Sequence, residues 1–351
     1  MTGHKKARAG FTLIELMVSM TVGLFVLAAA VQLTSDQSRL LGRASSRLEM
    51  HQAARLATDL LAQDLRHASV GLGYRPDGTF AGLSRGNFTV SGGASFQADD
   101  RVVTLSSGTV RTDDIGIRLA AGSIRTVASY SAATAQLCAG ADLEAGEVVV
   151  LLTREGLHAR TVQVSAFGPA VCRDGTCVQG CEDVTFASDS SYLSDVEATN
   201  ADYTEGEMAG EFQHLVWFLV ADANGRGLLQ RAEVTAQNPC AAADETCGGT
   251  VADNVEFLQA SVWQWDEDTQ TWVDRTTAGD LTDRSRVRID LELGVRAAHS
   301  DERDADQAVL RSELSPTVCV PGPCGRPRDK VQRYAVRSSV EIRNSGRMQI
   351  R

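Results

Sequence analysis

The chain has 351 residues, a formal net charge of −11 at pH 7 and a hydrophobic content of 43%. This length fits one large or two fused globular units, and the hydrophobic content is enough for a real core. An acidic chain without a basic patch is repelled by a phosphate backbone, so we expect no nucleic-acid partner. Aromatic residues make up 5% of the chain and glycine occurs 31 times, which favours a loop-rich β domain over a helical bundle.

The N-terminus consists of a short basic leader, residues 1–10, followed by the apolar stretch 11–33. A helix that crosses a bilayer needs about 20 apolar residues. The basic flank that precedes the stretch is expected to stay on the cytoplasmic side. The sequence therefore predicts a single transmembrane helix over 11–33.

The apolar stretch contains one charged residue, Glu15. A secretory signal peptide would be cleaved after its apolar segment, and Ala28-Ala29-Ala30 imitates such a site. In this chain, however, the apolar run starts directly after Gly10. A carboxylate inside a membrane segment costs about 2.5–3.5 kcal/mol on insertion scales. Glu15 is therefore expected to have a function, which an uncleaved signal anchor would not give it.

The string Gly10-Phe11-Thr12-Leu13-Ile14-Glu15 resembles the prepilin motif of type IV pilins and type II secretion pseudopilins. The resemblance implies cleavage after Gly10 by a prepilin peptidase and N-methylation of Phe11. It also implies that Glu15 pairs with the Phe11 amine of a neighbouring subunit during assembly. Gly10 suits the cleavage site because a residue without a side chain lets the backbone enter a narrow protease cleft.

A helical pattern continues from the apolar stretch to about residue 70. No proline interrupts 11–70, and the first stop is Gly71-Leu72-Gly73. The apolar residues at helical spacing predict one face that packs on a globular domain: Leu40, Leu41, Ala44, Leu48, Leu56, Leu60, Leu61 and Leu65. A freestanding coiled coil is disfavoured because the heptad register is not sustained.

After residue 76 the pattern changes to short β-branched segments that Gly, Asp and Ser separate. We expect a mainly antiparallel β region in 71–351. The predicted strands are 102–105, 115–119, 147–152, 161–164, 212–220, 228–232, 260–265, 287–293 and 333–342. Residues 222–227 and 266–270 are expected to form hairpin turns.

The order of several segments is similar to that of PilW-type minor pilins and, more loosely, of J-type minor pseudopilins. The segments are 218–234, 251–268, 286–296 and 334–344. In this pattern a Leu-rich pair ends in Arg231, an acidic turn follows at Val255–Leu258, and the terminal strand ends in Arg343-Asn344. Residues 80–210 resemble no family that we can name.

The eight cysteines occur in polar, Gly/Pro-flanked contexts, which indicates disulfides and an oxidising compartment. They are Cys138, Cys172, Cys177, Cys181, Cys240, Cys247, Cys319 and Cys324. Cys240 with Cys247 and Cys319 with Cys324 are plausible local pairs. The spacing of Cys172, Cys177 and Cys181 favours a disulfide with Cys138 or a neighbour over a zinc site, and one of the three must pair outside the trio or stay free.

We find no pattern that predicts catalysis, a bound metal or another cofactor. There is no G-x-S-x-G or H-E-x-x-H sequence, and His214 lies in an apolar strand, where a packed histidine is the better interpretation. The loop at Asp222 resembles a calcium loop only in part, because Arg226 interrupts its oxygen ligands. The acids Asp266, Glu267 and Asp268 fit a solvated turn.

The sequence thus predicts an α+β, pilin-like, non-enzymatic protein. Its parts are a leader (1–10), a helix (11–70) with a transmembrane segment (11–33), and a periplasmic β-rich domain (71–351). The resemblance implies a minor pilin of a type IV pilus, in a priming or tip complex for adhesion and twitching motility. It would be a single-pass inner-membrane protein before assembly, and would lie at the pilus base or tip after it.

The implied partners are other minor pilins, the major pilin, the inner-membrane assembly platform, the prepilin peptidase and a PilY-type tip adhesin. The alternative is a J-type minor pseudopilin of a type II secretion system. A membrane-anchored periplasmic enzyme is a third interpretation, and it would require a convergent polar site.

Overall fold

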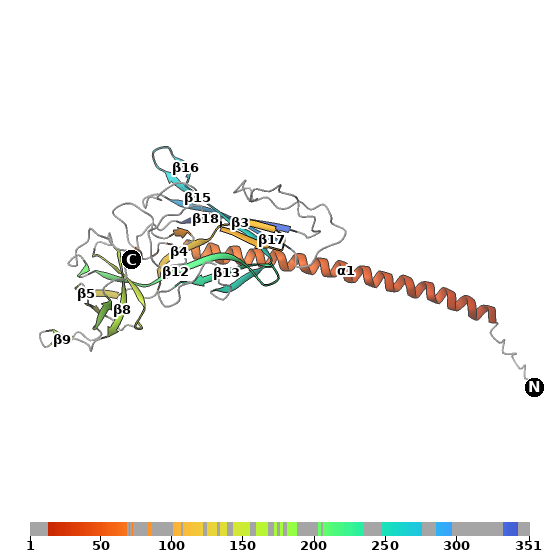
Figure 1. Cartoon of the computed structure of the whole chain (residues 1–351), viewed down its shortest axis with the longest axis horizontal. Coiled ribbons are helices and arrows are strands. Elements are labelled where there is room, and N and C mark those ends of the chain that lie inside the picture. Colours follow the sequence, from red (N-terminus) through yellow and green to blue (C-terminus); the bar gives the residue numbers. More distant parts are fainter. Residues whose placement is uncertain are drawn as a thin grey trace, which may run out of the picture. The chain divides into compact units, whose positions relative to one another are not determined.

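The computed structural model describes residues 13–68, 70, 72, 83–85, 101–106, 108–121, 125–131, 134–138, 143–154, 159–167, 172–173, 176–177, 181–187, 203–204, 206–234, 248–275, 286–296 and 333–342. Two compact units are distinguished, Met1–Glu49 and Met50–Arg351. A long helix followed by antiparallel strands confirms the expected α+β class (Figure 1).

Helix α1 spans Leu13–Arg66 and contributes to both units. It ends before the predicted stop at Gly71. The backbone amides of His67, Ala68 and Val70 donate to carbonyls three residues earlier, at 3.0, 3.1 and 3.1 Å. Such bonds tighten the chain after the last α-helical turn and pair groups that the helix itself leaves unsatisfied.

The predicted apolar face of α1 is wrong in its membership. Of the leucines that the pattern grouped together, only Leu61 and Leu65 lie in the core. The core-facing side of the helix is built mainly from small residues: Ala54, Ala57 and Ala62, together with Met50. Ala68, just after the helix, joins the same core. The remaining leucines are exposed: Leu40, Leu41, Leu48, Leu56 and Leu60. Alanines let the helix approach the sheets closely, a role that a search for large apolar residues overlooks.

Ten of the described strands form one antiparallel sheet, in the order β1-β4-β12-β5-β6-β11-β8-β7, with β13 and β14 continuing from β12. Their bounds are β1 Leu83–Arg85, β4 Ile115–Ala121, β5 Arg125–Tyr130, β6 Thr134–Cys138, β7 Val148–Leu152, β8 Ala159–Phe167, β11 Cys181–Ala187, β12 Glu207–Ala221, β13 Gly227–Glu233 and β14 Gly249–Asp253.

Part of this sheet closes on itself, because β7 also pairs with β12. The ring β12-β5-β6-β11-β8-β7 encloses its own core, which includes Val127, Leu137, Val149, Val184 and Tyr203. A closed ring leaves its strands without free edges. Five of its six strands, β5, β6, β7, β8 and β11, lie in the region 80–210, where sequence resemblance gave no guidance.

Strand β12 belongs both to this ring and to the open part of the sheet. Its register to β7 shifts between Met208 and Gly210, and Gly210 has φ +137°. A Cβ at Gly210 would collide with the backbone carbonyl of Ala121. A glycine at a bulge lets a strand bend and another backbone come close, so β12 can change direction here.

A second sheet has the order β16-β15-β17-β18. Its strands are β15 Val255–Asp266, β16 Thr271–Asp274, β17 Val287–Arg296 and β18 Arg333–Ile342. Its buried face shares one core with α1, β4, β12 and β13. Two further hairpins complete the described strands: β2 Arg101–Leu105 with β3 Gly108–Thr112, and β9 Cys172–Arg173 with β10 Thr176–Cys177.

The predicted acidic turn at Val255–Leu258 is wrong, because these residues begin strand β15. The turn lies one residue earlier, at Asn254, whose φ is 58°. Thr112 and Asp113 fix the start of β15: the amide of Asp113 donates to the Leu258 carbonyl at 2.8 Å, and the amide of Leu258 donates to Thr112 Oγ1 at 3.1 Å. These bonds connect the end of β3 and the residue that follows it to the second sheet.

Candidate functional site

The residues predicted to serve cleavage, methylation and assembly lie at the N-terminus, and the structure describes one of them, Glu15. Gly10 and Phe11 lie outside the described residues. Glu15 is in the first turn of α1 and exposed. It is the only ionisable side chain in Leu13–Val31. A carboxylate near a helix N-terminus is favoured by the helix dipole, and it gives an otherwise apolar segment one point of specific recognition.

The other two polar side chains of Leu13–Val31, Ser19 and Thr21, bond within the helix. Ser19 Oγ donates to the Glu15 carbonyl at 2.6 Å, and Thr21 Oγ1 donates to the Val18 carbonyl at 2.8 Å. Hydroxyls that donate to carbonyls of their own helix are already hydrogen-bonded, so burying them in an apolar environment costs little free energy.

Large apolar side chains cover the surface of this segment. Leu13, Ile14 and Phe25 have exposed fractions of 78%, 74% and 79%. Among the described helices, α1 is long and apolar enough to cross a membrane. An exposed surface of this kind requires either lipid or other helices around it.

Further along α1, within the β-rich unit, the carboxylate of Asp64 adds polar bonds to the apolar packing of the helix. Asp64 Oδ2 accepts hydrogen bonds from Trp217 Nε1 at 2.9 Å and from Arg231 Nε at 2.7 Å. Arg231 Nη2 donates to Asp64 Oδ1 at 3.3 Å. Trp217 on β12 is completely buried. We call Asp64, Trp217 and Arg231 the helix anchor.

The electrostatics of the helix anchor follow from this geometry. The hydrogen bond to Asp64 is the main reason that the pKa of the Arg231 guanidinium is raised, so Arg231 keeps its positive charge. Sequence analysis singled out Arg231 as part of a family pattern but missed Asp64 and Trp217. One sequence signal could have identified Asp64: it is an acid among the apolar residues near the end of α1. Burial of a carboxylate there is costly unless a donor on the sheet pairs with it.

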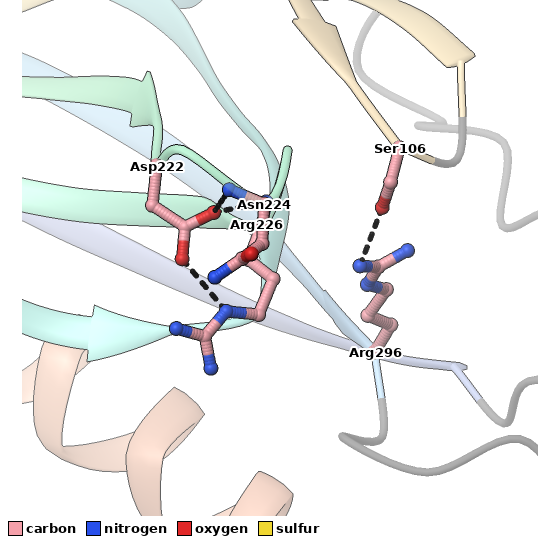
Figure 2. A network of polar contacts seen from close by, with 5 residues as sticks. All are labelled: Ser106, Asp222, Asn224, Arg226 and Arg296. Carbon is pink, nitrogen blue, oxygen red and sulfur yellow. Dashed lines mark hydrogen bonds and ion pairs between the residues drawn. The ribbon is translucent and has the colours of Figure 1, made fainter.

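The loop at Asp222 is a hairpin turn, as expected (Figure 2). Asp222 Oδ1 accepts the amides of Asn224 and Arg226 at 2.8 and 2.7 Å, and Asp222 Oδ2 pairs with Arg226 Nε at 2.7 Å. The hydrogen bond from the Arg226 amide is the main reason that the pKa of Asp222 is lowered. The turn itself thus uses both carboxylate oxygens, and Gly225 supplies the positive φ of 71°.

The same turn holds the β2–β3 hairpin. The amide of Ser106 donates to the Gly225 carbonyl at 2.7 Å. Arg296 Nη2 donates to Ser106 Oγ at 2.8 Å (Figure 2). The second acidic turn is also occupied by backbone donors, since Asp266 Oδ1 accepts the amides of Asp268 and Thr269 at 2.9 and 3.2 Å. Within the described residues, no group of three His, Cys, Asp or Glu side chains is arranged to hold a metal ion.

His214 is a core histidine, as the sequence predicted. It is fully buried on β12, directly opposite Arg118 of β4. Burial, helped by the charge of Arg118, lowers the pKa of His214 to about 3. The imidazole is therefore neutral at physiological pH. Nearby, burial and then the charges of Glu147 and Glu233 raise the pKa of Glu211.

Four of the predicted disulfide cysteines lie in described strands: Cys138 ends β6, Cys181 begins β11, Cys172 is in β9 and Cys177 in β10. The other four lie outside the described residues: Cys240, Cys247, Cys319 and Cys324.

The comparisons with known proteins bear on the N-terminus. Residues 5–31 match the prokaryotic N-terminal methylation motif, with which type IV pilin-like proteins of pili and pseudopili begin. No curated protein and no solved structure matches the chain. The motif and the apolar helix are consistent with an anchor in the inner membrane.

Proposed function

We propose that this chain, which carries the methylation motif, is a PilW-type minor pilin in the priming or tip complex of a type IV pilus. The observation that carries the proposal is the motif at residues 5–31, with Glu15 as the single ionisable residue of the apolar helix that follows. The segment order around Arg231 and β15 to β18 supports the minor-pilin assignment. In this role the chain would be a structural subunit and would catalyse no reaction.

In this proposal, the prepilin peptidase removes residues 1–10 and leaves Phe11 with a new amine, which is then methylated. The first turn of the mature helix then holds one positive and one negative group. Two such helices cannot easily bury both charges alone, but Glu15 of one subunit can neutralise the amine of the next. This pairing sets the axial offset between neighbouring subunits, while the exposed apolar side chains supply contact area.

Retention of Glu15 also bears on the position in the filament. An outermost subunit has no neighbour above it, so its carboxylate has no amine to neutralise. We therefore place this chain below the outermost subunit, in contact with other minor pilins, with the major pilin further down and a PilY-type adhesin at the tip.

The test is filament assembly with Glu15→Ala and, separately, with a cleavage-blocked Gly10→Leu variant. Asp36→Ala is the matched control, because Asp36 is an exposed acid on the same helix. We expect both test variants to reach the membrane and to lose incorporation into filaments, and the control to assemble normally. Normal assembly by both test variants would contradict the proposal.

The alternative, a J-type minor pseudopilin of a type II secretion system, shares the motif and the segment order. Deletion of the gene separates the two. Loss of surface pili and twitching motility with normal secretion supports the pilus, whereas accumulation of exoproteins in the periplasm with normal pili supports the secretion system.

A further inference from the structure

Four cysteines fall on facing strands in a way that the sequence alone does not show. Cys138 and Cys181 occupy one register position of the β6–β11 pair, and Cys172 and Cys177 occupy one register position of the β9–β10 pair. From the sequence alone, Cys172, Cys177 and Cys181 were all possible partners for Cys138. The strand registers separate these possibilities.

The β6–β11 register is continuous from Cys181↔Cys138 to Thr185↔Thr134. Buried residues determine it, because Leu137, Ala135 and Val184 all lie in the core of the ring. A slip by one residue would turn these side chains to the opposite face of the strands. Directly opposite residues in antiparallel strands have Cα atoms about 4.5–5.5 Å apart, which lies within the range of about 4.4–6.8 Å that a disulfide needs.

The β9–β10 hairpin gives the second pair. Thr176 faces Arg173 and Cys177 faces Cys172, and the residues between the strands are Asp174 and Gly175. Asp-Gly is typical of two-residue hairpin loops. In such a hairpin the residues that flank the loop form a hydrogen-bonded pair, so the next pair, Cys172 with Cys177, is of the closer, non-hydrogen-bonded type.

We infer that the mature protein contains two disulfides, Cys138–Cys181 and Cys172–Cys177. Each forms by exchange with a disulfide-carrying thiol oxidase. One thiolate attacks a sulfur of the oxidase disulfide and releases one oxidase thiol. The second thiolate then attacks the mixed disulfide and releases the other. The protein loses two electrons and two protons, and the oxidase disulfide is reduced to two thiols.

The pairing depends on export of the β-rich unit to an oxidising compartment and is independent of the choice between pilus and pseudopilus. Cys138–Cys181 joins two neighbouring strands of the closed ring. Cys172–Cys177 closes the hairpin that lies in sequence between β8 and β11. Both bonds therefore fall in the region for which the sequence offered no family pattern.

The test is thiol mapping of the full chain, extracted from membranes in detergent with free thiols blocked by N-ethylmaleimide under denaturing, non-reducing conditions. In the wild type we expect no label on these four cysteines. Cys138→Ser should acquire one label, at Cys181, and Cys172→Ser should acquire one label, at Cys177. Fragmentation of the labelled peptides locates the label.

Label on Cys172 or Cys177 in the Cys138→Ser variant, or on all four cysteines of the wild type, would overturn the inference. The serine variants could misfold, so a further variant tests the pairing with every cysteine in place. Gln179→Lys adds a trypsin site between Cys177 and Cys181. We then expect peptide 174–179 to be linked to 161–173, and 180–226 to be linked to 126–154. The crossed linkage would overturn the inference equally.

Discussion

The ring of Phe257 occupies the space that a side chain at Gly294 on β17 would need. The two residues face each other in the β15–β17 register, and a Cβ at Gly294 would lie 2.3 Å from the nearest ring carbon. Phe257 is almost fully buried. An aromatic ring over a cross-strand glycine fills the space beside it and fixes the strand register. The glycine in one segment and the phenylalanine in the other are therefore one packing unit.

We predict that Gly294→Ala lowers the free energy of unfolding by about 1–3 kcal/mol, the usual cost of overpacking a core. The matched control is Gly249→Ala, because a Cβ at Gly249 meets nothing within 4 Å. Urea unfolding of both variants measures the difference. Equal stability of the two variants would show that the Phe257 ring can move aside.

His214 makes stability depend on pH. Its pKa is about 3 in the folded protein, against about 6.5 in an unfolded chain, so below pH 6.5 the unfolded state binds a proton that the folded state does not. Stability from this group is complete above pH 6.5 and is lost as the pH falls towards 3. The loss between pH 6.5 and pH 5 is about 2 kcal/mol.

We predict that His214→Gln removes this part of the pH dependence, because glutamine does not titrate. Urea unfolding at pH 7.5, 6.5, 5.5 and 5 gives the slope. His67→Gln is the control, since His67 is exposed at the end of α1. An unchanged slope in His214→Gln would mean that other groups carry the acid sensitivity.

At the scale of elements, the helix anchor decides how firmly the end of α1 is held. Asp64 is the shared acceptor for Trp217 Nε1 and for the Arg231 guanidinium. Replacing it leaves two donors near the core without their charged partner, which costs more than the bonds themselves are worth.

We predict that Asp64→Asn destabilises the protein by about 1–3 kcal/mol and speeds amide hydrogen exchange in Met50–Arg66 more than in β17. Asp59→Asn is the control on the same helix, because Asp59 is exposed. Uniform acceleration of exchange throughout the unit would mean that the anchor supports the whole fold and not the helix alone.

Elements with strong local patterns were predictable from the sequence. Residues 333–342 were expected as a strand and form β18, and Asp266–Gln270 were expected as a turn between Trp265 and Trp272, which face each other across the β15–β16 hairpin. Strands β3, β5, β6, β11 and β14 were missed. They contain Ser, Thr, Gly, Gln and acidic residues, and their stability comes from neighbours distant in sequence rather than from their own propensity.

The helix anchor was unpredictable for the same reason. Its partners are separated by more than 150 residues, 153 between Asp64 and Trp217 and 167 between Asp64 and Arg231. The N-terminal motif, in contrast, is contiguous, so residues 5–31 are enough to identify the methylation motif.

At the scale of the whole molecule, the two units differ in what they need. Every buried core residue of α1 lies at or after Met50, whereas the described side chains of Leu13–Leu41 are all exposed. The β-rich unit therefore draws its stability from its own cores, and the preceding part of α1 depends on its surroundings. Closure of the ring through the β12–β7 pairing was also beyond sequence analysis, because it depends on the bend at Gly210.

We predict that a chain starting at Ser35 is soluble and folded, with a Tm within about 2 °C of that of the full chain in detergent. A chain starting at Ala62 is the control, because it lacks Met50, Ala54, Ala57 and Leu61 of the core. We expect that control to unfold or aggregate. Calorimetry and circular dichroism measure both, and a large fall in Tm for the first chain would show that the early helix stabilises the body.

The hydrogen bonds of Ser19 and Thr21 to carbonyls of their own helix affect the transfer of α1 between lipid and protein surroundings. In the proposed assembly α1 would pass from lipid into protein surroundings, and these hydrogen bonds would stay intact because both partners belong to the helix. The free-energy difference between the helix in lipid and the helix in protein surroundings then comes from its apolar contacts and from the carboxylate of Glu15. If the chain assembles as proposed, breaking of hydroxyl hydrogen bonds therefore adds no barrier to the transfer of this helix in either direction.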